Sequence, residues 1–597
     1  MESSTTPKRG VDAATIAEAF RLTAEQRADQ VAVRTKGGAV SWTWGELRDR
    51  VDRLAGSLSA LGLRKGDTIA LMLGNRPEFH QADLAAMMVG ATPFSIYMTY
   101  APNQIEYVVQ DAGAKIIVTE QQFLDNVLEA RKTLPGLAHV IVVDGDAVPE
   151  GVTRLDDLPA ADFDVDASVA ALGPEDVLTL IYTSGTTGPP KGVELVHRNL
   201  LSAVSGIEEI VQFPDGARVI SWLPNAHIAE RAAHHYLPIV FGFQVTCCPN
   251  PRDIIAFLPE VRPHWFFAVP RIWEKLKSGL EAMIAGQQPE QQQASRAAVA
   301  DGLQKVRLEQ AGEEVPAALA ERVAQADAAM FAGLRSMLGL DEVVAINVGA
   351  APTPVEVLEF FHAIGLPLGE LWGMSETCGG GAVNPPQRIK IGTVGPATPG
   401  CELKLADDGE LLIRGGLVMA GYRGLPDKTA EAIDAEGWLH TGDIAQIDGD
   451  GYVKIVDRKK EIIINAAGKN MSPANIEATI KSASPLIGNA VCIGDARPYN
   501  TALIVLDADF APAWAAQNGI EGATLESLSH DERVRAAIQE GIDGANAKLA
   551  RVEQIKKFVI VEGDWLPGGD ELTPTMKLKR KPIAEKYDRD IAGMYTK

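Results

Sequence analysis

The chain has 597 residues, of which 46% are hydrophobic and 23% charged, and its formal net charge is −23. This length is too great for a single hydrophobic core, so we expect more than one domain. The strong negative charge argues against nucleic acid as a partner, and it requires any anionic substrate to bind at a local basic site. Five cysteines without metal-ligand spacing are typical of a reducing compartment.

The start of the chain, MESSTTPKRG, is polar and lacks the apolar core of a signal peptide. No run approaches the ~20 apolar residues that span a bilayer. We therefore expect a cytoplasmic protein.

Residues 13–267 alternate short apolar runs with amphipathic stretches. DTIALML (67–73) and AKIIVT (114–119) are predicted strands, and EFHQADLAAMMVG (78–90) is a predicted helix. This alternation predicts an α/β domain with largely parallel sheets.

Residues 182–192, YTSGTTGPPKG, combine glycines, hydroxyl side chains and one lysine, which suits a loop that holds a polyphosphate. Two prolines separate Lys191 from Gly188, so this is not a Walker loop. Apolar, β-branched flanks predict a loop between two strands, and an ordinary hairpin is the alternative. The residues that we expect to bind phosphate are Thr183, Ser184, Gly185, Thr186, Thr187, Gly188 and Lys191.

Two further segments precede the middle of the chain. WLPNAHIAER (222–231) carries His227 and Arg231 after a tight turn, and a structural role for His227 is as compatible with the sequence as a catalytic one. Residues 283–330 are rich in Ala, Gln and Glu, and they predict a helical insertion interrupted at Gly302 and Gly312. A flexible linker is the alternative for this segment.

Small residues follow the apolar run VVAINV, and they leave room for a flat ring; they are Gly349, Ala350 and Ala351. LWGMSET (371–377) places Trp372 to stack on a base and Glu376 to hold Mg²⁺, with Thr377 as a phosphate donor. Gly373 and Met374 belong to the same nucleotide segment. Core packing of the tryptophan is the alternative.

EGWLHTGDIA (436–445) contains Asp443, whose carboxylate could accept hydrogen bonds from ribose hydroxyls, and Arg458 could converge on the same sugar. Asp-Gly turns predict hairpins within 403–416 and around 451–465. We read 457–460 as a charged interruption between two strands and place a domain boundary there. Near the end, LTPTMKLKRK (572–581) is either a solvated basic tail or the source of one active-site lysine.

In this order the motifs resemble those of the adenylate-forming superfamily, the AMP-dependent synthetases and ligases. YTSGTTGPPKG resembles its phosphate loop, LWGMSET its adenine and Mg²⁺ segment, and HTGD its ribose motif. DRKKEIIINAAGKNMSP resembles its hinge. Within the superfamily, LPNAHIAER, VPRIWEK, EGWLHTGDIAQIDGDGYVKIVDRKK and the helical insertion are most similar to long-chain fatty acyl-CoA synthetases.

The resemblance implies a large N-terminal domain of mixed and parallel sheets with flanking helices (1–456), a hinge (457–460) and a small mobile α+β C-terminal domain (461–597). It implies a ligase that uses ATP, Mg²⁺ and coenzyme A to activate a long-chain fatty acid. The residues it marks are Lys577, Glu376 and His227 as catalytic, Lys460 as the hinge, and Gly468, Lys469 and Asn470 as coenzyme A-binding. A fatty substrate is compatible with peripheral contact with a membrane.

Two positions depart from the family pattern. Met576 stands where many relatives have glycine before the catalytic lysine, and Arg231 stands where some bacterial enzymes have a tryptophan gate. Three other functions remain open: a fatty acyl-AMP ligase that serves a carrier protein, a luciferase-like oxygenase, and a binding protein without activity.

Overall fold

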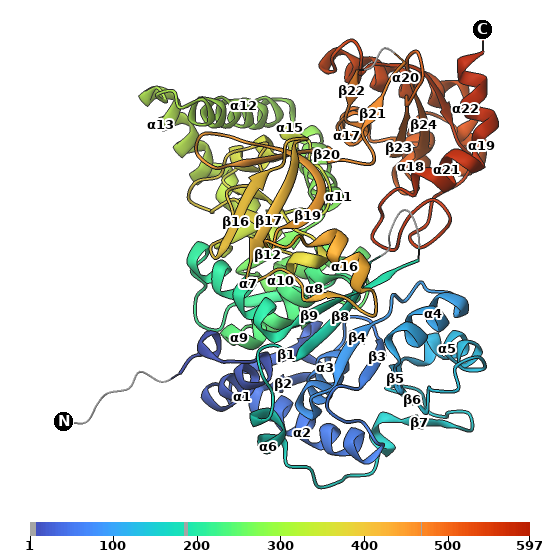
Figure 1. Cartoon of the computed structure of the whole chain (residues 1–597). Coiled ribbons are helices and arrows are strands. Elements are labelled where there is room, and N and C mark those ends of the chain that lie inside the picture. Colours follow the sequence, from blue (N-terminus) through green and yellow to red (C-terminus); the bar gives the residue numbers. More distant parts are fainter. Residues whose placement is uncertain (1–7, 184–188, 467–468, 597) are drawn as a thin grey trace.

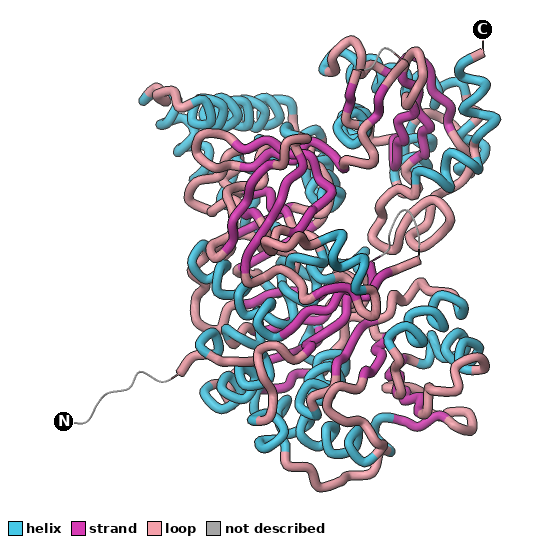
Figure 2. Tube along the Cα trace, in the orientation of Figure 1, coloured by secondary structure: helices cyan, strands magenta, loops and turns pink. Residues whose placement is uncertain are grey.

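The computed structural model describes residues 8–183, 189–466 and 469–596. A large N-terminal domain and a smaller C-terminal domain are visible in Figure 1, and Figure 2 shows that both domains mix helices and strands. This arrangement confirms the predicted fold class. Among the described residues, no helix combines the length and apolar character needed to cross a membrane.

The largest sheet of the N-terminal domain is mostly parallel and has helices on both faces. Successive residues of β3 point to opposite faces, so Ile69 and Leu71 pack in one core cluster and Ala70 and Met72 in another. Burial on both faces explains why its central strands read as continuous apolar runs. Its strands, in spatial order, are β18 (Gly421–Tyr422), β9 (Lys191–Val196), β8 (Val177–Thr183), β4 (Thr92–Ser95), β3 (Thr68–Met72), β5 (Ile116–Thr119), β6 (His139–Val142) and β7 (Val152–Arg154).

Three four-stranded sheets complete this domain. In spatial order, the strands of the first sheet are β10 (Arg218–Ser221), β11 (Gln244–Cys247), β1 (Val31–Thr35) and β2 (Ser41–Thr43). The strands of the second sheet, again in spatial order, are β12 (Trp265–Ala268), β13 (Ala345–Val348), β14 (Leu368–Trp372) and β15 (Ala382–Val383). Those of the third are β16 (Cys401–Leu405), β17 (Glu410–Gly415), β19 (Leu439–Ile447) and β20 (Val453–Arg458).

The helices of the N-terminal domain pack mainly on these sheets. They are α1 (Ile16–Gln26), α2 (Trp44–Ala60), α3 (Pro77–Val89), α4 (Pro102–Ala112), α5 (Leu124–Arg131), α6 (Val165–Ala170), α7 (His197–Ile210), α8 (Ile228–Arg231), α9 (Leu237–Phe241), α10 (Ile254–Val261), α11 (Pro270–Ala285), α12 (Pro289–Ala311), α13 (Ala317–Ala326), α14 (Ala332–Leu338), α15 (Val355–Ala363) and α16 (Pro426–Ala432).

The predicted helical insertion is present as α12 and α13, which extend from the body of the domain (Figure 1). Gly312 ends α12 in the left-handed conformation, as expected for a C-terminal glycine. The predicted interruption at Gly302 is wrong, because α12 continues through it. A Cβ at Gly302 would lie 2.6 Å from the carbonyl oxygen of Ala363, so this glycine permits close packing against α15.

The C-terminal domain contains a short hairpin and a three-stranded sheet between two helical layers. Its strands are β21 (Ile463–Ile464), β22 (Asn470–Met471), β23 (Ile487–Ile493), β24 (Asn500–Leu506) and β25 (Ile555–Ile560). Its helices are α17 (Pro473–Ala483), α18 (Phe510–Gln517), α19 (Leu525–Ser529), α20 (Glu532–Lys548), α21 (Arg580–Lys586) and α22 (Asp588–Tyr595).

Ion pairs connect the two domains. Lys275 of α11 lies 2.8 Å from Asp509, and Lys548 of α20 lies 2.9 Å from Glu356 of α15. Arg271 of α11 also pairs with Asp507 at the end of β24. These contacts hold the C-terminal domain over one side of the N-terminal domain.

Candidate functional site

The two strands that flank the predicted phosphate loop form an antiparallel pair. Thr183 ends β8, Lys191 begins β9, and the two residues face each other in the register. The loop therefore joins two strands, as the sequence predicts. Five of the predicted phosphate ligands lie outside the described residues, namely Ser184, Gly185, Thr186, Thr187 and Gly188.

Tyr422, which the sequence analysis did not single out, joins the predicted phosphate-binding lysine to the predicted metal-binding glutamate. The ammonium of Lys191 lies 3.8 Å from the centre of the Tyr422 ring, in a cation–π contact. The hydroxyl of Tyr422 donates a hydrogen bond of 2.8 Å to Oε1 of Glu376. Glu376 is 7% exposed, and burial lowers the pKa of Lys191 while the Glu376 charge opposes that shift. One tyrosine thus orients both charged groups.

A turn of tightly packed residues carries Glu376. Gly373 is required there because a Cβ would lie 2.2 Å from the carbonyl oxygen of Gly379. The hydroxyl of Thr377 accepts from the Met374 N–H at 3.0 Å and lies 3.2 Å from the Met374 carbonyl oxygen, to which it donates. Thr377 is fully buried. Its hydroxyl therefore stabilises this turn, η8 (Ser375–Thr377), and its contact with a phosphate stays a prediction.

Asp443 is held by two donors, one from the neighbouring strand β20 and one from β14 of another sheet. Arg458 stands opposite Asp443 in the β19–β20 register, and its Nε lies 2.9 Å from Oδ1. The indole N–H of Trp372 donates to Oδ2 at 2.8 Å. Burial raises the pKa of Asp443, and the Arg458 charge and the Trp372 hydrogen bond oppose that rise. The structure therefore joins three predicted nucleotide residues, and stacking of Trp372 on a base stays a prediction.

Asp457 and Arg458 belong to β20, so the predicted charged interruption between strands is shorter than expected. Asp457 accepts a hydrogen bond of 2.6 Å from the hydroxyl of Ser472, at the start of α17. Lys460 follows the strand, and its charge is one of the causes that lower the pKa of Lys191. The connection to the C-terminal domain therefore runs beside the phosphate lysine.

Lys577 reaches this site from the C-terminal domain. The residue keeps exposed surface although atoms of both domains crowd around its ammonium. The desolvation caused by this crowding and the charge of Arg458 lower the pKa of Lys577, whereas the carboxylates of Asp443 and Glu376 raise it. The segment that precedes Lys577 packs closely against the N-terminal domain, because a Cβ at Gly568 would lie 2.7 Å from Oγ1 of Thr99.

The backbone conformation at Met576 is one that glycine adopts more easily than methionine. Its φ of 65° lies in the left-handed region, which favours glycine. The backbone hydrogen bond from Met576 to the Thr573 carbonyl, at 2.9 Å, closes this turn. The turn directs Lys577, and the methionine side chain is 52% exposed.

His227 lies at the start of α8 as a neutral imidazole. Its Nδ1 accepts a hydrogen bond of 3.2 Å from the Ala229 N–H, so the hydrogen of the neutral ring belongs on Nε2. Burial, reinforced by the Lys577 charge, lowers the pKa of His227 to about 3. His227 therefore offers an N–H donor to a group near Lys577.

A fully buried polar network fixes the helix that follows His227. Arg231 pairs with Asp83 of α3 and donates to Oγ of Ser95 at 2.9 Å. Asp83 also contacts His235, which lies in the π-helical turn η5 (Ala232–Tyr236). Arg231 thus cross-links α8 to α3, and removal of either buried partner would leave an unpaired charge.

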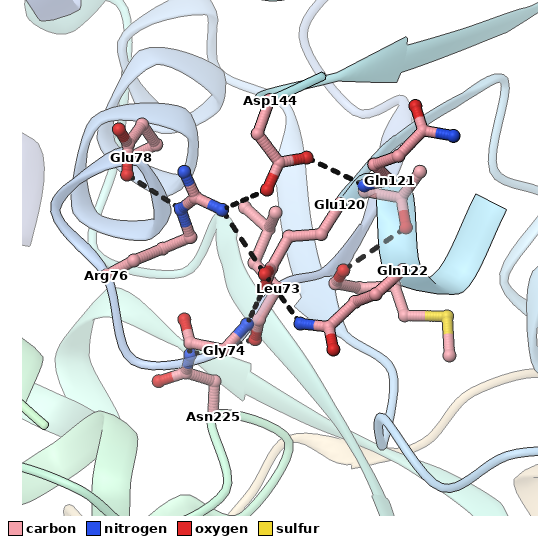
Figure 3. A network of polar contacts seen from close by, with 11 residues as sticks. Leu73, Gly74, Arg76, Glu78, Glu120, Gln121, Gln122, Asp144 and Asn225 are labelled. Atoms are coloured by element: carbon pink, nitrogen blue, oxygen red, sulfur yellow. Dashed lines mark hydrogen bonds and ion pairs between the residues drawn. The ribbon is translucent and has the colours of Figure 1, made fainter. Parts of the chain in front are cut away.

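A second network, shown in Figure 3, holds the segment before His227 at the carboxyl ends of parallel strands. The amide nitrogen of Asn225 donates to the carbonyl oxygens of Leu73 and Gly74 at 3.1 and 3.0 Å. Glu120 accepts from the Gly74 N–H at 2.6 Å and pairs with Arg76 at 3.2 Å. No sequence signal marks this network, because its members come from separate loops.

The other predicted residues occupy different surroundings. Gly349 packs so closely that a Cβ would lie 2.9 Å from Cδ1 of Leu371, and Ala350 has a φ of 70°. Ala351 is exposed next to them. Lys469 and Asn470 lie in the β21–β22 hairpin, at the end of the C-terminal domain far from β8 and β9 (Figure 1). Gly468 lies outside the described residues. The site next to Lys577 does not include Lys469 and Asn470 in this structure.

Comparison with known proteins agrees with this geometry. The model for AMP-binding enzymes matches residues 20–423, and the model for the C-terminal domain of AMP-binding enzymes matches residues 460–597. The chain therefore belongs to the AMP-binding enzyme family.

Particular relatives in this family extend over most of the chain. The chain is 35% identical to the long-chain-fatty-acid–CoA ligase FadD15 of Mycobacterium tuberculosis, covering 93% of this chain and 92% of that protein. It is 32% identical to the long-chain-fatty-acid–CoA ligase ACSBG2 of Gallus gallus, covering 97% and 81%. Its fold is similar to the crystal structure of the anthranilate CoA ligase AuaEII with anthranoyl-AMP, with a TM-score of 0.72, 20% identity and coverage of 99% and 100%.

Proposed function

We propose that the protein is an AMP-forming long-chain fatty-acid–CoA ligase. It converts a fatty acid and ATP into acyl-AMP and pyrophosphate, and it then transfers the acyl group to coenzyme A. The convergence of Lys577, Arg458, Asp443 and Glu376 on one site is the observation that carries the proposal. Relatives named long-chain-fatty-acid–CoA ligases, aligned over more than 90% of this chain, support the substrate class.

In the first half-reaction a carboxylate attacks the α-phosphate of ATP, and pyrophosphate leaves. Both reactants are anionic, so the protein must position them and neutralise the charge that develops between them. Lys577 supplies a positive charge at this point. The neutral His227 supplies an N–H donor without adding a second cation, because its pKa of about 3 keeps it uncharged at physiological pH.

The phosphate side of the site fits a Mg²⁺ ion that enters with ATP. The described residues contain no group of three or more His, Cys, Asp or Glu side chains placed to hold a metal. Mg²⁺ commonly binds through one or two carboxylates together with substrate phosphates. Glu376 would provide the carboxylate, Lys191 would contact the phosphates, and Tyr422 would keep both in place.

In the second half-reaction the thiol of coenzyme A attacks the acyl carbonyl, and AMP leaves. We assign Lys460 as the hinge within 457–460, since hinges are element-terminal residues that absorb a backbone change. Rotation there would remove Lys577 and bring Lys469 and Asn470, with Gly468, toward the acyl group. The β21–β22 hairpin lies at the far end of the C-terminal domain from β8 in Figure 1, which supports the need for such a rotation.

The proposal is tested by measuring AMP release from ATP and Mg²⁺ by purified protein, with and without coenzyme A, for acids from acetate to C18. We expect coenzyme A-dependent turnover that is fastest with long-chain acids. Acid-dependent adenylate that accumulates without consumption of coenzyme A would instead indicate an acyl-AMP ligase for a carrier protein. Absence of acid-dependent ATP–pyrophosphate exchange would reject any adenylating function.

A further inference from the structure

The C-terminal domain has an open sheet edge. Its described sheet has the order β23–β24–β25, and β25 pairs in parallel with β24. β25 is therefore an edge strand within this sheet. Asn546 of α20 pairs with the N–H and the carbonyl oxygen of Ile555, both at 2.9 Å, so the open part of the edge follows Ile555. An edge strand directs unpaired backbone N–H and C=O groups outward, and these groups can pair with another extended chain.

This edge lies in a slot between two helical layers. Residues of β25 alternate between two cores, with Phe558 in the cluster that contains α20 side chains and Val559 against the cluster that contains α22 side chains. The two helices therefore cover opposite faces of the sheet, and the strand edge lies between them. A cavity of about 400 Å³ at this edge is lined by Arg535, Gln539, Lys556, Lys557, Phe558, Val559, Arg589, Asp590, Gly593 and Met594.

Four cations from three elements surround the slot. Arg535 comes from α20, Lys556 and Lys557 from β25, and Arg589 from α22, while Asp590 is the one acid among the lining residues. This concentration of positive charge contrasts with the net charge of −23 for the whole chain. The slot therefore attracts an anionic ligand more strongly than the rest of the protein surface does.

Three of these cations also contact neighbouring residues of the C-terminal domain, and these contacts hold their side chains at the slot. The guanidinium of Arg535 lies 4.7 Å from the centre of the Phe558 ring. Lys557 donates to the Thr596 carbonyl oxygen at 3.0 Å, and Lys556 donates to Oε1 of Gln554 at 2.9 Å. Lysines on an edge strand can also serve to prevent unwanted pairing. Lysines on the strand would be enough to prevent such pairing, so this role does not account for Arg535 on α20 and Arg589 on α22.

We propose that the open edge of β25 is a docking site for an extended acidic segment of a partner protein. The segment would add a strand beside β25 through main-chain hydrogen bonds, and its carboxylates would face Arg535, Lys556, Lys557 and Arg589. A flat, anionic membrane surface fits less well, because a plane cannot reach a strand edge between two helices. α22 lies on the side of the domain turned away from β8 and β9 (Figure 1), so docking leaves the site at Lys577 accessible.

The proposal is tested with full-length protein and a fluorescein-labelled octapeptide that alternates valine and glutamate, followed by fluorescence anisotropy. We expect saturable binding that weakens as salt increases. The double variant Arg535→Glu/Arg589→Glu should bind at least about tenfold more weakly, and Lys556→Glu provides a second, milder reversal at the strand. Arg533→Glu is the matched control, because Arg533 lies on α20 outside the slot and pairs with Asp531 at 2.8 Å.

A second arm tests the strand pairing itself. The same peptide, N-methylated at alternate residues, keeps its charge but loses every second backbone donor, so its binding should also weaken about tenfold. Equal binding of the methylated peptide would overturn strand addition. Equal binding by the double variant, or binding of phosphatidylglycerol vesicles through these cations without peptide binding, would overturn the docking site. Basal adenylation should be unchanged in all variants.

Discussion

The two domains contribute to the active site in different ways. In the N-terminal domain, buried hydrogen bonds fix the charged groups: Asp443 between Trp372 and Arg458, and Glu376 against Tyr422. The C-terminal domain contributes Lys577 from a loop, and ion pairs such as Lys275–Asp509, whose side chains are 42% and 78% exposed, hold that domain in place. Exposed pairs of this kind typically stabilise by only ~0–1 kcal/mol.

The nucleotide residues are thus held by short hydrogen bonds within the N-terminal domain, and we infer that the partly exposed ion pairs of the C-terminal domain allow it to move away with Lys577. A preorganised half lowers the cost of orienting charges during the reaction. A weakly attached half permits a second arrangement for the second half-reaction. Variants in each half can separate these two contributions.

The largest expected effect comes from removal of the mobile cation. Lys577→Ala should slow adenylation by about 10²–10³-fold, the usual cost of losing one group that stabilises a charged transition state. Thioester formation from supplied acyl-AMP should remain, since that step uses another surface. ATP–pyrophosphate exchange and acyl-CoA formation from synthetic adenylate measure the two steps. Lys581→Ala, at a residue 79% exposed on α21, is the control, and equal loss of both steps would contradict this separation.

A smaller effect is expected at the fixed half. Tyr422→Phe keeps the ring beneath Lys191 but removes the hydrogen bond to Glu376, and hydrogen bonds to charged groups contribute ~1.5–3 kcal/mol. We expect the Mg²⁺ concentration for half-maximal exchange to rise about tenfold, with little change in the KM for ATP. Tyr422→Leu should also raise the KM for ATP. Identical behaviour of the two variants would show that Tyr422 does not connect the two groups.

The stability of the N-terminal domain should depend on pH through Glu370, which lies on the same strand as Trp372. Burial raises its pKa to about 7, above its ordinary value of 4.5. The neutral form is therefore favoured in the folded protein, and the stability it contributes is present below pH 4.5 and lost as pH rises through about 7. Glu370→Gln should remove this loss, which amounts to at most ~3 kcal/mol. Urea unfolding at pH 5 and pH 8 measures it, and parallel pH dependence in both proteins would contradict the assignment.

The smallest effect concerns the turn before Lys577. Met576 adopts a left-handed conformation that costs an L-residue ~1–2 kcal/mol. Met576→Gly should therefore keep adenylation within about twofold, whereas Met576→Val should reduce it, because a β-branched residue tolerates this conformation poorly. ATP–pyrophosphate exchange measures both. A severe loss in the glycine variant would mean that the methionine side chain itself contributes to the site.

Much of the fold could be predicted because local patterns decide it. The apolar flanks of the loop at 182–192 predicted the β8–β9 pair, and the composition of 283–330 predicted α12 and α13. Gly302 was misread because a glycine that packs against another helix has the same letter as one that ends a helix. Only the position of Ala363 in space distinguishes the two.

Site residues that belong to a sequence motif could be predicted. Site residues that depend on contacts between distant segments could not. Asp443 and Arg458 were expected to converge on one sugar, and the structure places them opposite each other in the β19–β20 register, while ribose binding stays a prediction. Tyr422 and Asn225 were missed as site residues, because their roles depend on contacts with Glu376 and with the end of β3. The hydrogen bonds of Thr377 within its own turn were also missed, since a hydroxyl that stabilises its turn and one that binds phosphate look alike in sequence.

We propose that rotation at one hinge lets two surfaces of the C-terminal domain serve the site in turn, and the variant Lys460→Pro separates the two steps. Proline fixes φ near −65° and should block rotation at this residue. We predict adenylate formation close to that of the unchanged protein but loss of transfer to coenzyme A, measured separately in one preparation with Lys460→Ala as the control. Normal overall turnover in Lys460→Pro would show that transfer to coenzyme A needs no rotation at this residue.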